Sequence, residues 1–208
     1  MKYFIVICMI LVCWGNLYDA SAQHLTNRQI EDLKTDSNLV ATTSLGFYNW
    51  YLSCLKHDST YNIIQPLYHW HDKIPVIETN EYIMRLEEMH LVSETFINFE
   101  KERFRICQDS LNHIDFDAVL KDGGPIGYYY DECYFIESYY WLASQEYPDS
   151  CEIKKIDING NIATCQLLFF WNSENSLGKQ YDTNFYCCLK LRKYAKNWRI
   201  DSIDIKRN

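Results

Sequence analysis

The segment from Asn184 to Ile205 constrains the fold more than any other part of the chain. Its first half alternates apolar and polar side chains: Phe185, Cys187, Leu189 and Leu191 against Tyr186, Cys188, Lys190 and Arg192. Neighbouring side chains on a β-strand point to opposite faces. The pattern therefore predicts a strand with one apolar face on a core and one basic face toward water, as in an antiparallel sheet covered on one side.

A turn at Ala195-Lys196-Asn197 leads into a second strand whose pattern changes phase. Its apolar residues are Trp198 and Ile200 in one phase, then Ile203 and Ile205 in the other. A phase change within a strand is typical of a β-bulge, in which one extra residue bends the strand. The sequence predicts this bulge near Asp201-Ser202.

A second hairpin is predicted from Cys151 to Trp171, because Asn-Gly between alternating segments is a strong turn signal. With Asn159 and Gly160 as the turn, Ile158 pairs with Asn161, Ile156 with Ala163 and Lys154 with Cys165. One face then collects the apolar side chains Ile156, Ile158, Ala163, Cys165, Leu167, Phe169 and Trp171.

Helices are predicted before the strands. Residues 40–57 carry an apolar face at helical spacing, which Trp50 and Cys54 widen, and Asp36 or Ser37 is the expected cap. The face consists of Phe47, Tyr48, Tyr51, Leu52 and Leu55. It should lie on the apolar face of the sheet.

Two further helices are predicted at residues 80–90 and after Ser93, which is a good helix cap. In the last one, Ile97, Phe104, Cys107 and Leu111 form a stripe, and the charge run Glu100-Lys101-Glu102-Arg103 is interpreted as a solvated face. Helices followed by long antiparallel strands predict an α+β fold.

The N-terminus has the pattern of a signal peptide. Lys2 precedes an apolar run from Tyr3 to Cys13, and Ala20-Ser21-Ala22 offers a cleavage site. We expect a signal peptide at residues 1–22, a polar lead-in at 23–39 and a single α+β domain at 40–208. The protein would be exported, to the periplasm or the extracellular space, with no transmembrane anchor after signal removal.

Composition excludes some classes of function. The chain has 208 residues, a formal charge of −8 and 16% aromatic residues. Aromatic content this high is incompatible with disorder, and the acidity argues against a nucleic-acid partner, which requires clustered basic residues.

Cysteines are numerous but form no metal motif. Removal of the signal peptide leaves Cys54, Cys107, Cys133, Cys151, Cys165, Cys187 and Cys188. Export permits disulfides, and an odd number leaves at least one cysteine free or paired between chains. Cys187 and Cys188 point to opposite faces, which argues against their pairing. Several of these residues are also typical of small buried apolar side chains.

A family resemblance rests on short motifs between Ala41 and Ile205. These are Phe47-Tyr48-x-Trp50-Tyr51-Leu52, Tyr82-x-x-x-Leu86, Leu91-Val92-Ser93, Asp131 with Phe135-Ile136-x-Ser138, and Leu189-x-Leu191 through Trp198-x-Ile200-x-x-Ile203. The chain resembles the cystatin-like or nuclear-transport-factor-2-like cone, and more narrowly the DUF3828 family of exported bacterial proteins. The resemblance implies helices packed on a curved antiparallel sheet and an extracytoplasmic setting; it implies no activity and no catalytic residues.

Such a cone offers a pocket between helices and sheet, for which Trp50, Tyr51, Tyr82 and Trp171 are the candidate ligand-binding residues. The alternative is that these aromatics fill the space as core. No catalytic residue stands out, since no known catalytic motif is present.

Two polar clusters were weighed as metal sites. In His69-Trp70-His71-Asp72, an extended backbone would place both imidazoles on one face, but two ligands do not complete a site. Asp115, Asp117 and Asp122 near His113 lack the full calcium-loop pattern. We therefore predict neither a metal nor a cofactor.

Three functions remain open. The first is a non-catalytic exported protein that binds a small molecule or another protein. The second is a pocket-type enzyme, namely a hydrolase, dehydratase or isomerase that uses acid–base chemistry. The third is an immunity-like protein that binds a toxic enzyme. The oligomeric state is not predicted.

Overall fold

A computed structural model describes residues 27–56, 67–71, 74–113, 115, 117, 121, 133, 140–142, 147–172, 179–181 and 185–207. The chain divides into two compact units, Met1–Thr35 and Asp36–Asn208. The described part of the first unit is the beginning of helix α2 (Asn27–Lys56). The expected signal peptide at residues 1–22 lies outside the described residues.

The second unit is α+β, as predicted. After α2 come the strands β1 (Leu67–His71) and β2 (Ile74–Glu78), the helices α3 (Asn80–Glu88) and α4 (Glu94–Leu111), and the short helix η3 (Tyr140–Leu142). The strands β3 (Ser150–Asn159), β4 (Ile162–Asn172), β5 (Lys179–Tyr181), β6 (Phe185–Tyr194) and β7 (Asn197–Arg207) follow. None of the described helices has an apolar stretch long enough to cross a membrane.

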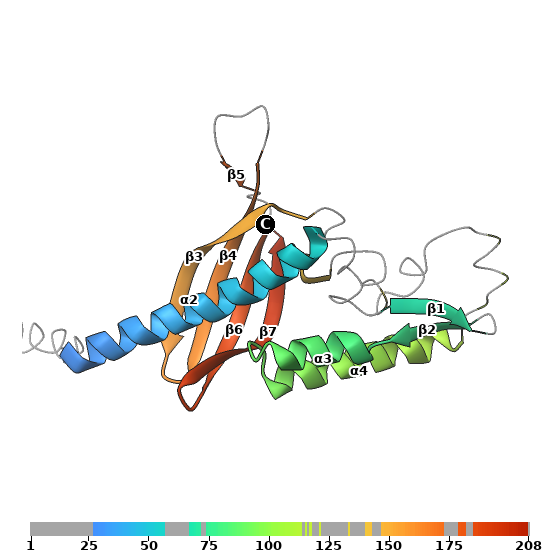
Figure 1. Cartoon of the computed structure of the whole chain (residues 1–208), viewed down its shortest axis with the longest axis horizontal. Helices are drawn as coiled ribbons and strands as arrows, with labels where there is room; N and C mark the ends of the chain where they lie inside the picture. Colours follow the sequence, from blue (N-terminus) through green and yellow to red (C-terminus); the bar gives the residue numbers. More distant parts are fainter. Residues whose placement is uncertain are drawn as a thin grey trace, which may run out of the picture. The chain divides into compact units, whose positions relative to one another are not determined.

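The four long strands form an antiparallel sheet in the order β3-β4-β6-β7, and β5 pairs with β4 (Figure 1). The predicted apolar face is confirmed. Its buried members include Ala163, Cys165, Leu167, Phe169, Cys187, Leu189, Leu191 and Ile200. The aromatic face of α2 packs on these strands, since the ring of Tyr48 lies 5.1 Å from that of Phe169 and Thr43 donates a hydrogen bond to the carbonyl of Trp198.

The predicted bulge in β7 is confirmed. Lys190 pairs with Ser202 and the next residue, Leu191, pairs with Ile200, so Asp201 is the extra residue. The bulge keeps the apolar side chains before and after it on the same face, with Ile203 opposite Leu189. A second register shift lies between Ile153 and Lys155 in β3. Bulges bend and twist the strands that contain them, which favours a curved sheet.

The predicted register of the β3–β4 hairpin is wrong by one turn residue. Gly160 and Asn161 form the turn, so Asn159 pairs with Ile162 and Ile158 with Ala163. Gly160 has a φ of 59°. A positive φ at the first turn position is what a type II′ turn requires, and glycine meets that requirement best there. The apolar face is unchanged because side-chain alternation is kept.

The β6–β7 turn is also shorter than predicted and gives a stability prediction. Tyr194 pairs with Asn197, so the turn is Ala195-Lys196, and Ala195 has a φ of 55°. A residue with a Cβ is strained there.

We expect Ala195→Gly to raise the free energy of unfolding by about 0.5–1 kcal/mol. Urea denaturation would measure the change, and Lys196→Gly, where φ is not positive, should give no gain.

Helix α2 starts earlier than predicted, and the polar lead-in is partly helical. The sequence placed the start near Val40 with Asp36 or Ser37 as cap, whereas the helix begins at Asn27. Side chains of residues 31–35 are exposed, so this part needs no apolar face.

Asp36 accepts hydrogen bonds from Lys193 (2.7 Å) and the indole of Trp198 (3.0 Å). Burial alone would raise the pKa of Asp36, but these two donors outweigh it and lower the pKa.

Helices α3 and α4 agree with the prediction. The Ser93 side chain caps α4 by accepting a hydrogen bond from the amide of Phe96. The Ser93 amide also donates to the Ile200 carbonyl, and the Ile200 amide donates to Leu91. These backbone bonds attach the α3–α4 connection to the edge strand β7.

The connection between α2 and α3, which the sequence did not resolve, contains the antiparallel ribbon β1–β2. His69 and His71 lie on β1, so the expected extended backbone is confirmed. Asp122 and Asp131, with the Phe135 to Ser138 segment, lie outside the described residues. Asp115 and Asp117 are exposed.

Candidate functional site

The four predicted pocket aromatics occupy or border the buried core. Tyr51 and Tyr82 are buried, and Trp50 and Trp171 are partly buried against the same cluster. Trp171 lies on β4 opposite Gln180 of β5. The interpretation of these residues as core is therefore supported by where they lie, while their role in ligand binding stays a prediction.

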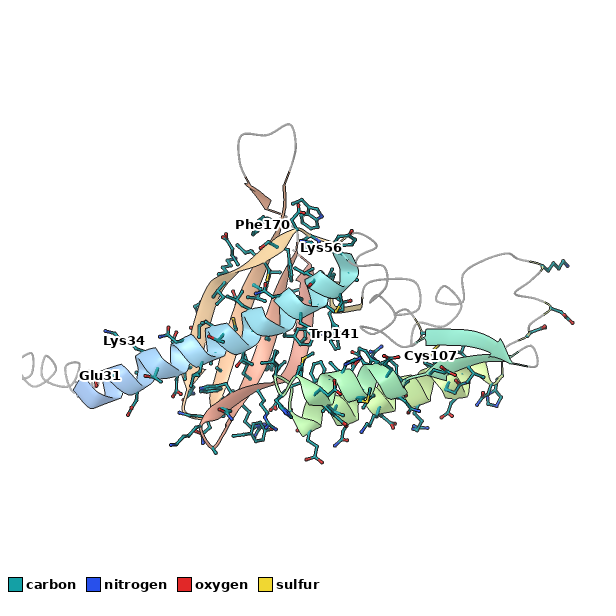
Figure 2. All side chains as sticks on the ribbon, in the orientation of Figure 1. Glu31, Lys34, Lys56, Cys107, Trp141 and Phe170 are labelled. Atoms are coloured by element: carbon teal, nitrogen blue, oxygen red, sulfur yellow. A yellow bond between two sulfur atoms is a disulfide. The ribbon has the colours of Figure 1, made fainter. Side chains whose placement is uncertain are left out.

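Ring contacts join two of the four predicted aromatics, and a hydrogen bond connects a third to them. The ring of Phe47 lies 6.0 Å from that of Trp50, 6.3 Å from Tyr51 and 6.2 Å from Trp141. Trp141 lies on η3 (Figure 2). Its indole donates a hydrogen bond to the Tyr82 hydroxyl at 3.1 Å. Phe47, which sequence reasoning placed only on a helix face, is thus the centre of the aromatic cluster.

A buried carboxylate ends this chain of contacts. Glu100, on α4, is fully buried, and its Oε2 accepts a hydrogen bond from the Tyr82 hydroxyl at 2.8 Å. Arg103 donates to both carboxylate oxygens, at 3.1 Å from Nε and 2.6 Å from the second nitrogen. We call Tyr82, Glu100, Arg103 and Trp141 the buried network. It connects α3, α4 and η3 through charge-assisted and neutral hydrogen bonds.

The surroundings of the buried network stabilise this pairing. The Arg103 guanidinium lies 4.3 Å from the centre of the Phe104 ring, a cation–π distance. Burial raises the pKa of Tyr82 well above its usual value, and the Glu100 charge adds to the rise. Tyr82 is therefore a neutral hydrogen-bond donor at physiological pH.

The predicted solvated face is wrong for Glu100. The run Glu100-Lys101-Glu102-Arg103 was expected to face water, but Glu100 is buried and the Arg103 side chain is only 11% exposed. The spacing of Glu100 from the apolar residues of α4 does indicate its burial. Glu100 lies three residues after Ile97 and four before Phe104, which places it on the apolar stripe of α4.

The sheet contributes thiols rather than charges to the interior. Cys187 lies 2.9 Å from the Tyr48 hydroxyl, which donates to the Trp141 carbonyl, so the thiol is the donor to Tyr48. Burial raises the pKa of the Cys187 thiol strongly, and that of Cys151 to about 12. A thiol nucleophile requires a lowered pKa. These two cysteines are packing residues, as the sequence indicated.

The structure contains the disulfide Cys107–Cys133, which the sequence did not assign. Cys151, Cys165, Cys187 and Cys188 are free, which includes both neighbours whose pairing the sequence argued against. The disulfide links Cys107, on α4, to Cys133 at a sequence separation of 26 residues.

Removing this disulfide should destabilise the fold. We expect Cys107→Ala/Cys133→Ala to lower the free energy of unfolding by about 3 kcal/mol, because a cross-link of this span restricts the unfolded chain. Urea denaturation without reductant would measure the loss. Cys54→Ala, at a partly buried cysteine outside this disulfide, is the control and should cost less than half as much. Equal losses in both would contradict the prediction.

Outside the core, a hollow of about 350 Å³ lies between α3 and α4. It is lined by Thr79, Asn80, Ile83, Met84, Glu87 and Lys101. None of the predicted pocket aromatics lines it. Within the described residues, no group of three His, Cys, Asp or Glu side chains is arranged to hold a metal ion.

Comparison with known proteins gives no match: no family model, no curated protein and no solved structure matches the chain significantly.

Proposed function

We propose that the protein is an exported, non-catalytic binding protein that recognises its partner with its surface. The observation that carries the proposal is the buried network. Glu100 has both carboxylate oxygens engaged, by Tyr82 and by Arg103. A general acid or base must exchange a proton with a substrate, and this carboxylate is committed to its protein partners.

The packing of the aromatics supports the same proposal. Phe47 and Tyr51 are fully buried, and Tyr82 is 2% exposed. Side chains that contact one another in this way take up space that a small ligand would need. A surface partner is thus favoured over a ligand in the interior, and over the alternative of a pocket-type hydrolase, dehydratase or isomerase.

Two features support export. The N-terminal pattern is that of a signal peptide, and the Cys107–Cys133 disulfide is of a kind that persists in oxidising compartments. The proposed fold is a curved-sheet cone like that of the cystatin-like and nuclear-transport-factor-2-like proteins, with DUF3828 as the proposed family. The antiparallel sheet, with its two bulges and with α2 packed on it, is compatible with this proposal.

Native mass spectrometry tests the proposed function. The mature protein, Gln23 to Asn208, would be purified from its own host without reduction and measured under native and denaturing conditions. We expect an additional protein-sized mass in the native spectrum that is lost on denaturation. The denatured chain should also retain one disulfide between Cys107 and Cys133.

Turnover would overturn the proposal. If the purified protein hydrolyses, dehydrates or isomerises a substrate, and a substitution that leaves the fold intact abolishes the reaction, the enzyme alternative replaces it. A bound small molecule that is displaced by replacing Trp50 or Trp171 would also contradict a surface mode of binding.

A further inference from the structure

We infer that the outer face of the sheet, at the end where its two hairpins turn, binds an acidic segment of another protein. This inference rests on the proposed binding function and identifies its surface. The surface, here called the hairpin-end patch, consists of Ile162, Lys190, Arg192, Tyr194, Lys196 and Arg199. Their neighbours along the strands, including Ala163, Leu191 and Ile200, point into the core.

The patch contains two like charges directly opposite each other. Arg192 on β6 is the cross-strand partner of Arg199 on β7, and of Ile162 on β4 on its other side. Like charges at opposed positions destabilise a sheet. A local arrangement that opposes folding is typical of functional sites. An anionic partner would be attracted to both guanidinium groups and would offset their mutual repulsion.

The bulge in β7 holds part of the patch in place. Asp201, the extra residue, accepts hydrogen bonds from Arg192 Nε at 2.8 Å and from the Tyr194 hydroxyl at 3.1 Å. The Arg192 side chain is nevertheless 54% exposed. The Arg199 guanidinium lies 5.9 Å from the centre of the Tyr194 ring. Side chains fixed before binding lose less entropy when a partner docks.

The patch carries more positive charge than its acidic neighbours neutralise. Arg192 has Asp201 as its partner, whereas Lys190 and Lys196 are exposed and form no ion pair in the described part of the chain. The neighbouring Lys193 is neutralised by Asp36. This basic surface belongs to a chain with a formal charge of −8. A local reversal of charge steers an acidic partner to this one face.

The apolar members indicate the class of partner. Ile162 is 53% exposed and Tyr194 is 37% exposed. Arginine and tyrosine beside an exposed aliphatic side chain are typical of protein–protein interfaces. A nucleic acid presents mainly charged phosphates, which Ile162 does not match, and these phosphates would be repelled by the acidic remainder of the chain. An acidic protein segment with apolar side chains fits both parts of the patch.

Fluorescence anisotropy with a defined probe tests the inference. The probe is a fluorescein-labelled synthetic peptide of twelve residues in which glutamates alternate with leucine and tyrosine; its counterpart has glutamine for every glutamate. We expect the mature protein to bind the acidic peptide at low salt at least tenfold more tightly than its counterpart. Lys190→Glu/Arg199→Glu should weaken binding of the acidic peptide at least tenfold.

The control is Lys101→Glu/Arg105→Glu on α4, which changes the net charge by the same amount at exposed residues outside the patch. It should weaken binding less than threefold. Arg199→Glu places opposite charges on facing positions with Arg192, so the patch variant should melt at no lower temperature than wild type. Equal weakening by both double variants, or no preference for the acidic peptide, would overturn the inference.

Two competitors address other polyanions. If vesicles of phosphatidylglycerol or a 20-base-pair DNA duplex bind the wild type but not the patch variant, and the acidic peptide does not bind, the assignment to a protein partner is wrong. Failure here is distinguishable from failure of the proposed function. If native mass spectrometry shows a partner but the peptide does not bind, only the assignment of the patch is wrong. Catalytic turnover would contradict only the proposed function.

Discussion

Replacing Arg103 with alanine is expected to lower the free energy of unfolding by about 3–5 kcal/mol, because it leaves the Glu100 carboxylate buried without its countercharge. Glu100 is completely buried and depends on Arg103 for contacts to both oxygens. The Tyr82 hydroxyl alone cannot replace a positive charge. Urea denaturation followed by circular dichroism measures the loss.

Arg105 provides the matched control on the same helix. It forms ion pairs with Glu102 and Asp109, but its side chain is 58% exposed. Exposed pairs contribute little, so Arg105→Ala should cost less than about 1 kcal/mol. If the two variants are equally stable, the buried network does not have the structural role assigned to it.

Replacing Phe47 with alanine should be as damaging as the loss of Arg103. Phe47 is 0% exposed, and its ring lies within 6.3 Å of the rings of Tyr48, Trp50, Tyr51, Phe96 and Trp141. Truncation leaves a cavity that these rings can fill only in part. We expect a loss of about 3–5 kcal/mol in the free energy of unfolding.

Phe99→Ala is the control that distinguishes the effect of burial from the effect of residue type. It is the same residue on a helix, but it is 58% exposed. Phe99→Ala should change the free energy of unfolding by less than about 0.5 kcal/mol. Thermal and urea denaturation of both variants would measure the difference. A small loss for Phe47→Ala would mean that the aromatic cluster is loosely packed and that its space is open to ligands.

The sheet was the most predictable part of the fold. The phase change between Ile200 and Ile203 predicted a bulge near Asp201-Ser202, because alternation must be kept if both residues face the core. The observed register makes Asp201 the extra residue. Turn register was less predictable. Asn159-Gly160 signals a turn, but shifting the turn by one residue to Gly160-Asn161 buries the same side chains.

Sequence periodicity gave no indication of where α2 begins, because residues 31–35 are exposed and carry no apolar stripe. The role of Asp36 depends on Lys193 and Trp198, which are far away in the sequence. A long-range pair of this kind has no local signature. Asp36 resembled a helix cap because it is an aspartate just before the apolar residues of the predicted helix.

The candidate ligand-binding residues were Trp50, Tyr51, Tyr82 and Trp171. Tyr51 and Tyr82 are buried, and the role of all four in ligand binding stays a prediction. The prediction for the charged residues was wrong. Glu100 was assigned to water because its neighbours in the sequence are charged, although its spacing from Ile97 places it on the buried stripe. Charge runs on a helix therefore have to be divided by face before they are interpreted.

Site-specific photo-crosslinking in the native host tests the central claim, binding of a protein at the surface, most directly. A photoreactive phenylalanine derivative would replace Ile162 in the hairpin-end patch and, as control, Phe99 on α4; both positions are more than half exposed. We expect one defined protein adduct from position 162 that is absent from position 99 and is lost when Arg199→Glu is added. An adduct from position 99 but not from 162, or one that Arg199→Glu does not affect, would contradict it.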